Sequence, residues 1–463
     1  MLRTLIFFVL ALTSLAPDTL AAGENSIAGP WRGTLDVGNG IKLRIVFHFK
    51  VSSKGILGGT MDSVDQGATG IPLSKVTLKK NTLHVESAAV QGTYDATLSA
   101  NGRKFTGTWK QGPAKLALNL EPGTFAEKKR SQEPIPPFPY VSENVTFSNP
   151  GAKITLAGTL TMPRKGGPFP AVLLISGSGP QDRDESLAGH RPFAVLADHL
   201  TRKGIAVLRV DDRGVGKSTG SFAVATTTDF MLDAQAALKF LRSRKGIDAR
   251  RTGLLGHSEG AIVAALLAAK DRNVAYTVLL AGPGVKGEQL ILRQTVLLQR
   301  SMGVPEKDIA RGQAQARRIY SILRSKKDTA TVRKELTRLA AEMKDGSERE
   351  ALTRQFGTLT SPWFRQFLVL DPAVALQKVK CPVLAVTGAR DLQVDPDQNL
   401  PAIKAALKAG GNTDYTVRKL PGLNHLLQAA RTGTIDEYAR IEETVNPAAL
   451  NAVSGWILSR TRR

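Results

Sequence analysis

The chain has a single cysteine, Cys381, among its 463 residues, so it cannot form an internal disulfide. Cys381 precedes a proline and an apolar run, a setting typical of a small buried side chain rather than a reactive thiol. Zinc-finger spacings and aromatic RNA-binding motifs are also absent. We therefore expect no nucleic-acid partner, no metal and no cofactor.

Acidic residues are few compared with basic ones. The chain has 63 lysines and arginines against 40 aspartates and glutamates, and its formal net charge is +23. Such a charge favours contact with an anionic surface, substrate or polymer, to which the basic N-terminal strands are suited. Solubility in an acidic or crowded compartment also explains the charge, and we prefer that explanation.

Long apolar runs are missing beyond the N-terminus, so the sequence predicts no transmembrane anchor. Residues 1–22 have the pattern of a secretory signal peptide: Arg3 is followed by the apolar run Leu5–Leu12, and small residues end at Ala22. We expect cleavage near Ala22 and a periplasmic or secreted mature protein.

Residues 24–125 predict a β-rich N-terminal domain, either a barrel or a sandwich. In residues 41–51, apolar and polar side chains alternate, as in a half-buried antiparallel strand. Several such stretches, separated by turn signals such as Asn101-Gly102, predict about eight short strands. Residues 126–140 are charged and then proline-rich, which is typical of an interdomain linker.

Residues 141–463 predict an α/β domain with a mostly parallel sheet. Short, continuously apolar runs alternate with helical patterns, as expected for buried parallel strands; the runs are 170–176, 205–210, 251–257, 275–282 and 382–388. Between about 286 and 374 only charged helical patterns occur. This interval predicts a helical cap inserted into the domain.

The stretch Gly256-His257-Ser258-Glu259-Gly260 fits the G-x-S-x-G nucleophile elbow. An apolar strand pattern precedes it and a helix of small residues follows, as the elbow requires. The glycines are expected because the serine sits on a cramped, strained turn between these two elements. We predict that Ser258 is a catalytic nucleophile.

A nucleophilic serine needs a base and an orienting acid, which follow it along the chain in this fold. His425 is the only histidine after the elbow region, and it lies in a loop after a strand pattern. Asp391 comes three residues after the strand-ending Gly388, and we prefer it as the acid over Asp395, whose position before a proline suits a helix start.

The oxyanion hole of such a site needs two backbone N–H groups. One comes from the residue after the nucleophile, Glu259. The other should come from the glycine-rich loop after the strand at 170–176, where we choose Ser178, with Gly179 next.

A second stretch, Val210–Gly220, ends in Gly216-Lys217-Ser218 like a nucleotide phosphate loop. The pattern needs a glycine where this chain has Asp211, whose carboxylate would repel a phosphate. The stretch follows a strand pattern and leads into a helix, so we expect it to be a structural loop.

Taken together, these residues resemble the α/β-hydrolase superfamily, and most closely the secreted bacterial esterases grouped with serine-aminopeptidase-like hydrolases. The motifs "SGSGPQDRDE", "DDRGVGKSTG", "GHSEG", "CPVLAVTGARDLQVDP" and "NHLLQ" carry the resemblance over most of residues 140–460. It implies an α/β-hydrolase fold with Ser258 as nucleophile, Asp391 as acid and His425 as base. It also implies that Asp212 and Arg213 brace loops near the site.

Three functions fit these residues. The first is hydrolysis of a small carboxylic ester through an acyl-enzyme. The second is an aminopeptidase or amidase on the same triad, which would need a cap carboxylate to hold the free amine; the candidates are Glu288, Glu306 and Glu342. The third is a binding protein on an inactive hydrolase scaffold, which an intact triad argues against.

Overall fold

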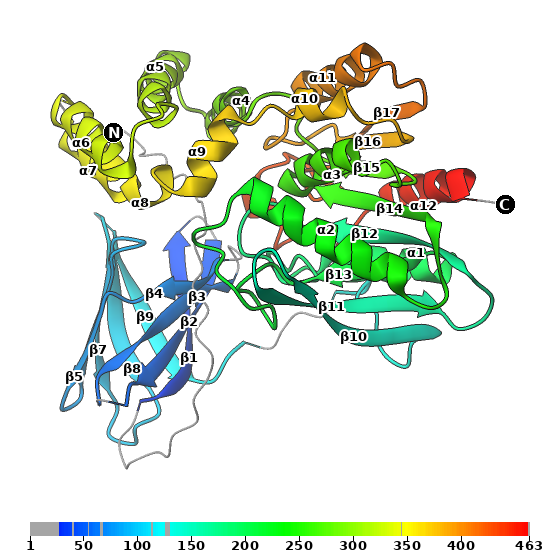
Figure 1. The fold of residues 1–463 in the computed structure, drawn as a ribbon. Helices are drawn as coiled ribbons and strands as arrows, with labels where there is room; N and C mark the ends of the chain where they lie inside the picture. Colours follow the sequence, from blue (N-terminus) through cyan, green and yellow to red (C-terminus); the bar gives the residue numbers. More distant parts are fainter. Residues whose placement is uncertain are drawn as a thin grey trace. The chain divides into compact units, whose positions relative to one another are not determined.

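The protein is described by a computed structural model, in which the chain forms two compact units (Figure 1). Of the described residues, the smaller unit contains 27–125 and the segment Leu187–His190, and the larger contains Arg130–Ser186 and 191–461. The structure describes residues 27–461 except 39–40, 54, 65–67, 113, 126–129 and 344. The predicted signal peptide, 1–22, lies outside the described residues.

The smaller unit is an antiparallel sheet of nine strands in the order β4-β3-β2-β1-β9-β8-β7-β6-β5. All nine strands contribute side chains to one core, which includes Phe47, Tyr94 and Leu120, so the sheet curls around its own interior. The alternation predicted for residues 41–51 is found in β2, where Phe47 and Phe49 are buried. The strands are β1 (Gly29–Gly38), β2 (Ile41–Val51), β3 (Leu57–Ser63), β4 (Ala68–Pro72), β5 (Lys75–Lys79), β6 (Thr82–Ser87), β7 (Gly92–Leu98), β8 (Phe105–Gln111) and β9 (Ala114–Pro122).

The larger unit is built on a sheet of eight strands in the order β10-β11-β13-β12-β14-β15-β16-β17. The hairpin β10–β11 pairs antiparallel with β13, and every later neighbour pair is parallel. The mostly parallel α/β-hydrolase sheet is thus confirmed. Its strands are β10 (Tyr140–Asn149), β11 (Ile154–Pro163), β12 (Phe169–Ile175), β13 (Ala206–Val210), β14 (Ile247–His257), β15 (Thr277–Leu280), β16 (Val383–Gly388) and β17 (Tyr415–Leu420).

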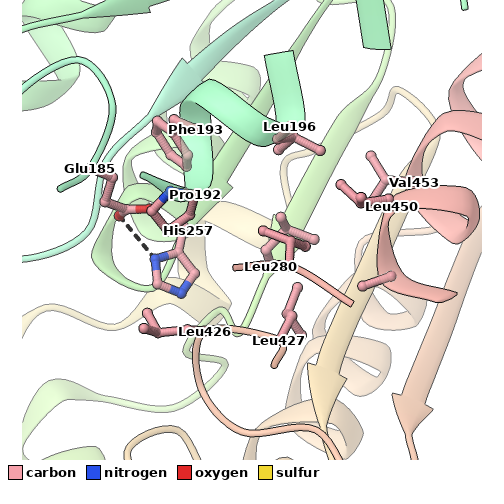
Figure 2. A pocket seen from close by; sticks show the side chains of 12 residues that line it. Glu185, Pro192, Phe193, Leu196, His257, Leu280, Leu426, Leu427, Leu450 and Val453 are labelled. Carbon is pink, nitrogen blue, oxygen red and sulfur yellow. Dashed lines mark hydrogen bonds and ion pairs between the residues drawn. The ribbon is translucent and has the colours of Figure 1, made fainter. Parts of the chain in front are cut away.

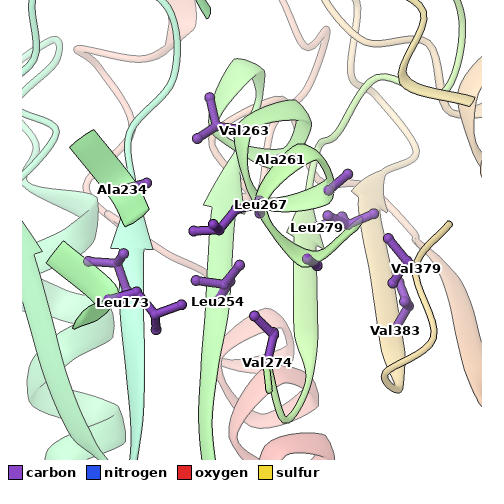
Figure 3. Close-up of a cluster of buried hydrophobic side chains, with 14 of the residues drawn as sticks. Leu173, Ala234, Leu254, Ala261, Val263, Leu267, Val274, Leu279, Val379 and Val383 are labelled. Carbon is purple, nitrogen blue, oxygen red and sulfur yellow. The ribbon is translucent and has the colours of Figure 1, made fainter. Parts of the chain in front are cut away.

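Helices cover both faces of this sheet, which explains why its central strands are continuously apolar. One core cluster, drawn in Figure 3, joins β12, β14 and β15 to helices α2 and α3 through residues such as Leu173, Leu254 and Leu267. A second cluster lies between the sheet and helices α1 and α12. These helices are α1 (Pro192–Arg202), α2 (Thr227–Ser243), α3 (Glu259–Lys270), α11 (Pro396–Ala409) and α12 (Pro447–Thr461).

Between β15 and β16 the chain is helical, in the interval where the sequence predicts a cap. These helices enclose an apolar core of their own, with Leu336, Leu368 and Val332 fully buried. They are α4 (Gly287–Ser301), α5 (Glu306–Leu323), α6 (Thr329–Ala341), α7 (Gly346–Arg354), α8 (Phe356–Leu359), α9 (Pro362–Val369) and α10 (Pro372–Leu376), and a short 3₁₀ helix, η2 (Ile435–Glu437), follows β17.

The second half of the predicted linker belongs to the larger unit. The Arg130 guanidinium is buried and donates hydrogen bonds to the carbonyls of Ala439 and Ile441, and the Gln132 amide oxygen accepts from the backbone N–H of Val445. Within the part of the chain that the structure describes, no helix combines the length and the apolar character needed to cross a bilayer.

Candidate active site

Ser258 occupies a strained turn between β14 and α3. Its backbone has φ 53° and ψ −120°, in a region that favours glycine and costs a residue with a side chain about 1–3 kcal/mol. A Cβ on Gly256 would lie 2.5 Å from the N atom of Ala261 and closer still to the carbonyl oxygen of Gly260. The glycines around Ser258 are therefore required by sterics, as the elbow motif predicts.

The loops after β16 and β17 bring Asp391 and His425 together. The Asp391 Oδ2 atom lies 2.8 Å from His425 Nδ1, and both side chains are buried. Asp391 Oδ1 accepts the backbone N–H groups of Gln393 and Val394, each at 2.8 Å. The carboxylate is thus held by three donors and can orient the imidazole with its Nε2 edge left for another group.

Asp395, the alternative acid, serves a different purpose. Its carboxylate accepts the backbone N–H of Asp397 at the start of α11 and forms an ion pair with Arg293 at 2.6 Å. It is a helix cap, in agreement with its position before a proline.

The glycine-rich loop after β12 lies beside the nucleophile. A Cβ on Gly177 would come within 3.2 Å of the Ser258 Cβ atom. The Gly177 N–H itself is donated to the Glu185 carboxylate at 2.6 Å, so an oxyanion donor must come from a neighbouring residue. Ser178 is next along the loop, and its hydroxyl donates to Glu259 at 2.6 Å. The two residues predicted to supply oxyanion N–H groups therefore touch each other, and their backbone roles stay a prediction.

His257, the residue before Ser258, contacts the loops on either side of it. Its Nδ1 atom lies 2.9 Å from Glu185 Oε1 (Figure 2). Its Nε2 atom lies 3.1 Å from the carbonyl oxygen of His425. The ring centres of His257 and His425 are 4.9 Å apart. Burial disfavours the imidazolium, but the Glu185 carboxylate, the His425 carbonyl and the Asp391 charge together outweigh it, so the pKa of His257 is raised.

Both acceptors of His257 are oxygen atoms, so two ring N–H groups, and hence a charged imidazolium, satisfy them best. Glu185 then bridges the glycine-rich loop after β12 (the predicted oxyanion loop), at Gly177, to His257, and His257 bridges to the backbone of His425. Sequence reasoning missed Glu185. The only signal was its presence in the stretch "SGSGPQDRDE", where it follows the glycines by a few residues.

A small cavity of about 20 Å³ borders His257. Figure 2 draws the side chains that line it. Its walls are almost entirely apolar, from α1, β15 and α12, and include Phe193, Leu280 and Val453. A space of this size holds no more than about one water molecule, so it is a packing defect rather than a substrate pocket.

The stretch from Val210 to Gly220 holds the glycine-rich loop after β12 in place. The Asp212 carboxylate accepts the Ser176 hydroxyl and the Gln181 N–H, each at 2.9 Å. The Lys217 N–H, which in a phosphate loop would face a phosphate, donates to Asp211 at 3.0 Å. The loop is closed on its own carboxylate, as the aspartate at this position predicts.

Comparison with known proteins agrees with this fold. A family model described as serine aminopeptidase, S33, matches residues 190–429, about half of the chain, and this range contains Ser258, Asp391 and His425. The chain belongs to the S33 family.

This S33 protein is 26% identical over 307 residues to the esterase EstD of Thermotoga maritima, covering 65% of each chain. It is 31% identical over 147 residues to the esterase FrsA of Escherichia coli O157:H7, covering 32% of this chain and 33% of that one. The chain therefore spans just under two thirds of the length of EstD and a third of FrsA.

Among solved structures, the esterase Pf2001 of Pyrococcus furiosus is 17% identical, with 69% of this chain and 91% of that chain covered at a TM-score of 0.42. Est1E of Butyrivibrio proteoclasticus, solved with ferulic acid bound, is 18% identical, with 69% and 100% covered at a TM-score of 0.40.

Proposed function

We propose that this protein is a carboxylic ester hydrolase that works through an acyl-enzyme on Ser258. The observation that carries the proposal is the strained elbow at Ser258, together with the buried hydrogen bond between Asp391 and His425. The similarity to EstD supports an ester as the substrate.

In this mechanism, His425 removes the hydroxyl proton of Ser258 as the oxygen attacks the acyl carbon. The proton is then delivered to the leaving alcohol, and water releases the acid by the same steps in reverse order. Asp391 holds the imidazole in the tautomer that leaves Nε2 as the base. The N–H groups of Glu259 and Ser178 would stabilise the negative oxygen that develops in each transition state. No cofactor takes part in these steps.

The aminopeptidase alternative is less favoured because the three cap glutamates that could hold an amine are already paired. Glu288, Glu306 and Glu342 form ion pairs with Arg324, Arg300 and Arg318, at distances of 2.9, 2.7 and 2.6 Å. Whichever of the three glutamates held the substrate ammonium, its arginine partner would have to be displaced.

The test compares a chromogenic short-chain acyl ester with an aminoacyl anilide. We expect the wild type to prefer the ester and Ser258→Ala to lose about a million-fold in kcat. Ser459→Ala, which alters an exposed serine of α12, is the control and should keep full activity. A folded Ser258→Ala protein with wild-type rates would refute the nucleophile, and faster cleavage of the anilide would favour the aminopeptidase.

We also propose that the protein is periplasmic or secreted, because residues 1–22 have the pattern of a signal peptide. N-terminal sequencing of protein recovered from the exported fraction should find a chain that begins near Gly23. A chain that keeps Met1 and stays in the cytoplasm would contradict this.

A further inference from the structure

The carboxylate of Glu259, the residue after the proposed nucleophile, is buried and accepts hydrogen bonds from three separate elements. Oε2 accepts the Ser178 hydroxyl at 2.6 Å, and Oε1 accepts the Thr227 hydroxyl at 2.6 Å. The indole N–H of Trp363 is shared between the two oxygens, at 2.9 and 3.1 Å. These donors belong to the oxyanion loop, the start of α2 and cap helix α9.

Burying a carboxylate at this position costs folding free energy. Glu259 is 3% exposed, its three donors are neutral groups, and burial raises its pKa against the opposing effect of those hydrogen bonds. An apolar residue would fill the space at lower cost. The carboxylate is therefore best explained by what it holds in place.

The oxyanion loop needs such an anchor because it is not supported by close packing on one side. Ser176 and Gly177 border a cavity of about 50 Å³, which Glu259 and Asp212 also line. Side chains that border a cavity lose contacts with neighbouring atoms on that side. The position of the loop thus depends on its hydrogen bonds, from Ser178 to Glu259, from Ser176 to Asp212 and from Gly177 to Glu185.

Cap helix α9 is held at the same point. Trp363 stacks on Phe367 of the same helix, with ring centres 5.4 Å apart. One turn along from Trp363, Gln366 exchanges two hydrogen bonds with Thr228 at the start of α2, at 3.0 and 3.1 Å. Because Thr227 donates to Glu259, α9 and the start of α2 converge on one carboxylate.

We propose that Glu259 is a positioning residue that ties the oxyanion loop at Ser178 to the cap at Trp363. Any displacement of α9 is then transmitted to the loop that supplies an oxyanion N–H group. The inference rests on the proposed function, since it assumes that Ser178 lies in an oxyanion hole. It adds that the cap helps to set the rate of the chemical step as well as access for the substrate.

Trp363→Phe is the sharpest test, because it keeps an aromatic ring while it removes the N–H donor and part of the indole's bulk. Oxyanion stabilisation acts in the transition state, so the loss should appear in kcat while KM stays near wild type. We expect about a tenfold lower kcat for a short-chain ester, less than the hundredfold or greater loss on removing an oxyanion donor outright. The matched control is Trp456→Phe in α12, which removes an indole donor to Thr416. This control should leave kcat within about twofold of wild type. Its change in melting temperature should be similar to that of Trp363→Phe.

A double variant shows whether both contacts act through Glu259. Ser178→Ala alone should also lower kcat, and with Trp363→Phe the combined loss should be smaller than the product of the two single losses, because both remove donors to one carboxylate. Glu259→Gln, which keeps one acceptor oxygen, should retain more kcat than Glu259→Ala.

A wild-type kcat in Trp363→Phe would overturn the inference. So would a loss of kcat in the double variant equal to the product of the two single losses. A change confined to KM would also do so, since it would limit the cap to substrate access. Ser258→Ala separates this outcome from failure of the proposed function. If that variant is inactive and Trp363→Phe is normal, only the coupling through Glu259 is wrong; if it is active, the proposed function is wrong.

Discussion

Gly260 of α3 lies against the backbone where β12 ends and the glycine-rich loop begins, so Gly260→Ala is an informative perturbation. A Cβ there would lie 2.5 Å from the carbonyl oxygen of Ser176 and closer still to that of Ile175. Carbon and oxygen atoms in proteins normally approach to about 3.3 Å. Both opposing atoms belong to the backbone, so the helix and the loop must separate by about 1 Å.

Two effects of the substitution oppose each other. Overpacking a core costs about 1–3 kcal/mol, and a clash with backbone belongs at the upper end of that range. Alanine in place of glycine within α3 returns about 1 kcal/mol through helix propensity. We therefore expect a net loss of about 2 kcal/mol and a fall in melting temperature of about 4 °C for a unit of this size.

Gly455→Ala in α12 is the control, because a Cβ there has no other atom within 4 Å. It should stabilise the protein by about 0.5–1 kcal/mol. The kinetic effects should differ too, since a displacement of about 1 Å in the oxyanion loop can lower kcat about a hundredfold. Thermal melts and ester kinetics on both variants provide the assay. If Gly260→Ala melts as high as Gly455→Ala and keeps wild-type kcat, the close approach does not shape the site.

Three further outcomes are expected. Asp391→Asn should lower kcat about ten-thousand-fold by favouring the wrong imidazole tautomer, whereas Asp395→Asn preserves a helix cap and should cost less than tenfold; the reverse order in ester kinetics would reassign the acid. The raised pKa of His257 means that its pairing with Glu185 stabilises the fold fully below pH 6.5 and that this contribution is lost as pH rises through the folded-state pKa. The stability difference between wild type and Glu185→Gln in urea should therefore shrink from pH 6 to pH 9, and a constant difference would argue against the ion pair. Lys217→Ala should leave ester hydrolysis within about fivefold, and calorimetry should find no ATP binding that depends on this side chain.

The sequence alone was sufficient for features that depend on neighbouring residues. Apolar runs marked the parallel strands because strands covered on both faces have no polar side. The spacing of Gly256, Ser258 and Gly260 predicted the elbow because steric conflict at a tight turn arises within a few residues. The helix start at Asp395 is local in the same way, since a cap acts on its own first turn.

Only the tertiary structure decided which side chains meet at the end of the sheet. Glu185 and His257 are 72 positions apart, and Glu259 and Trp363 are 104 apart, so no local pattern links them. Their contacts depend on the strand order, which places the loop after β12 beside the loop after β14. A buried carboxylate is recognisable in the sequence only as an acidic residue, because its burial and its donors come from segments that the fold brings together.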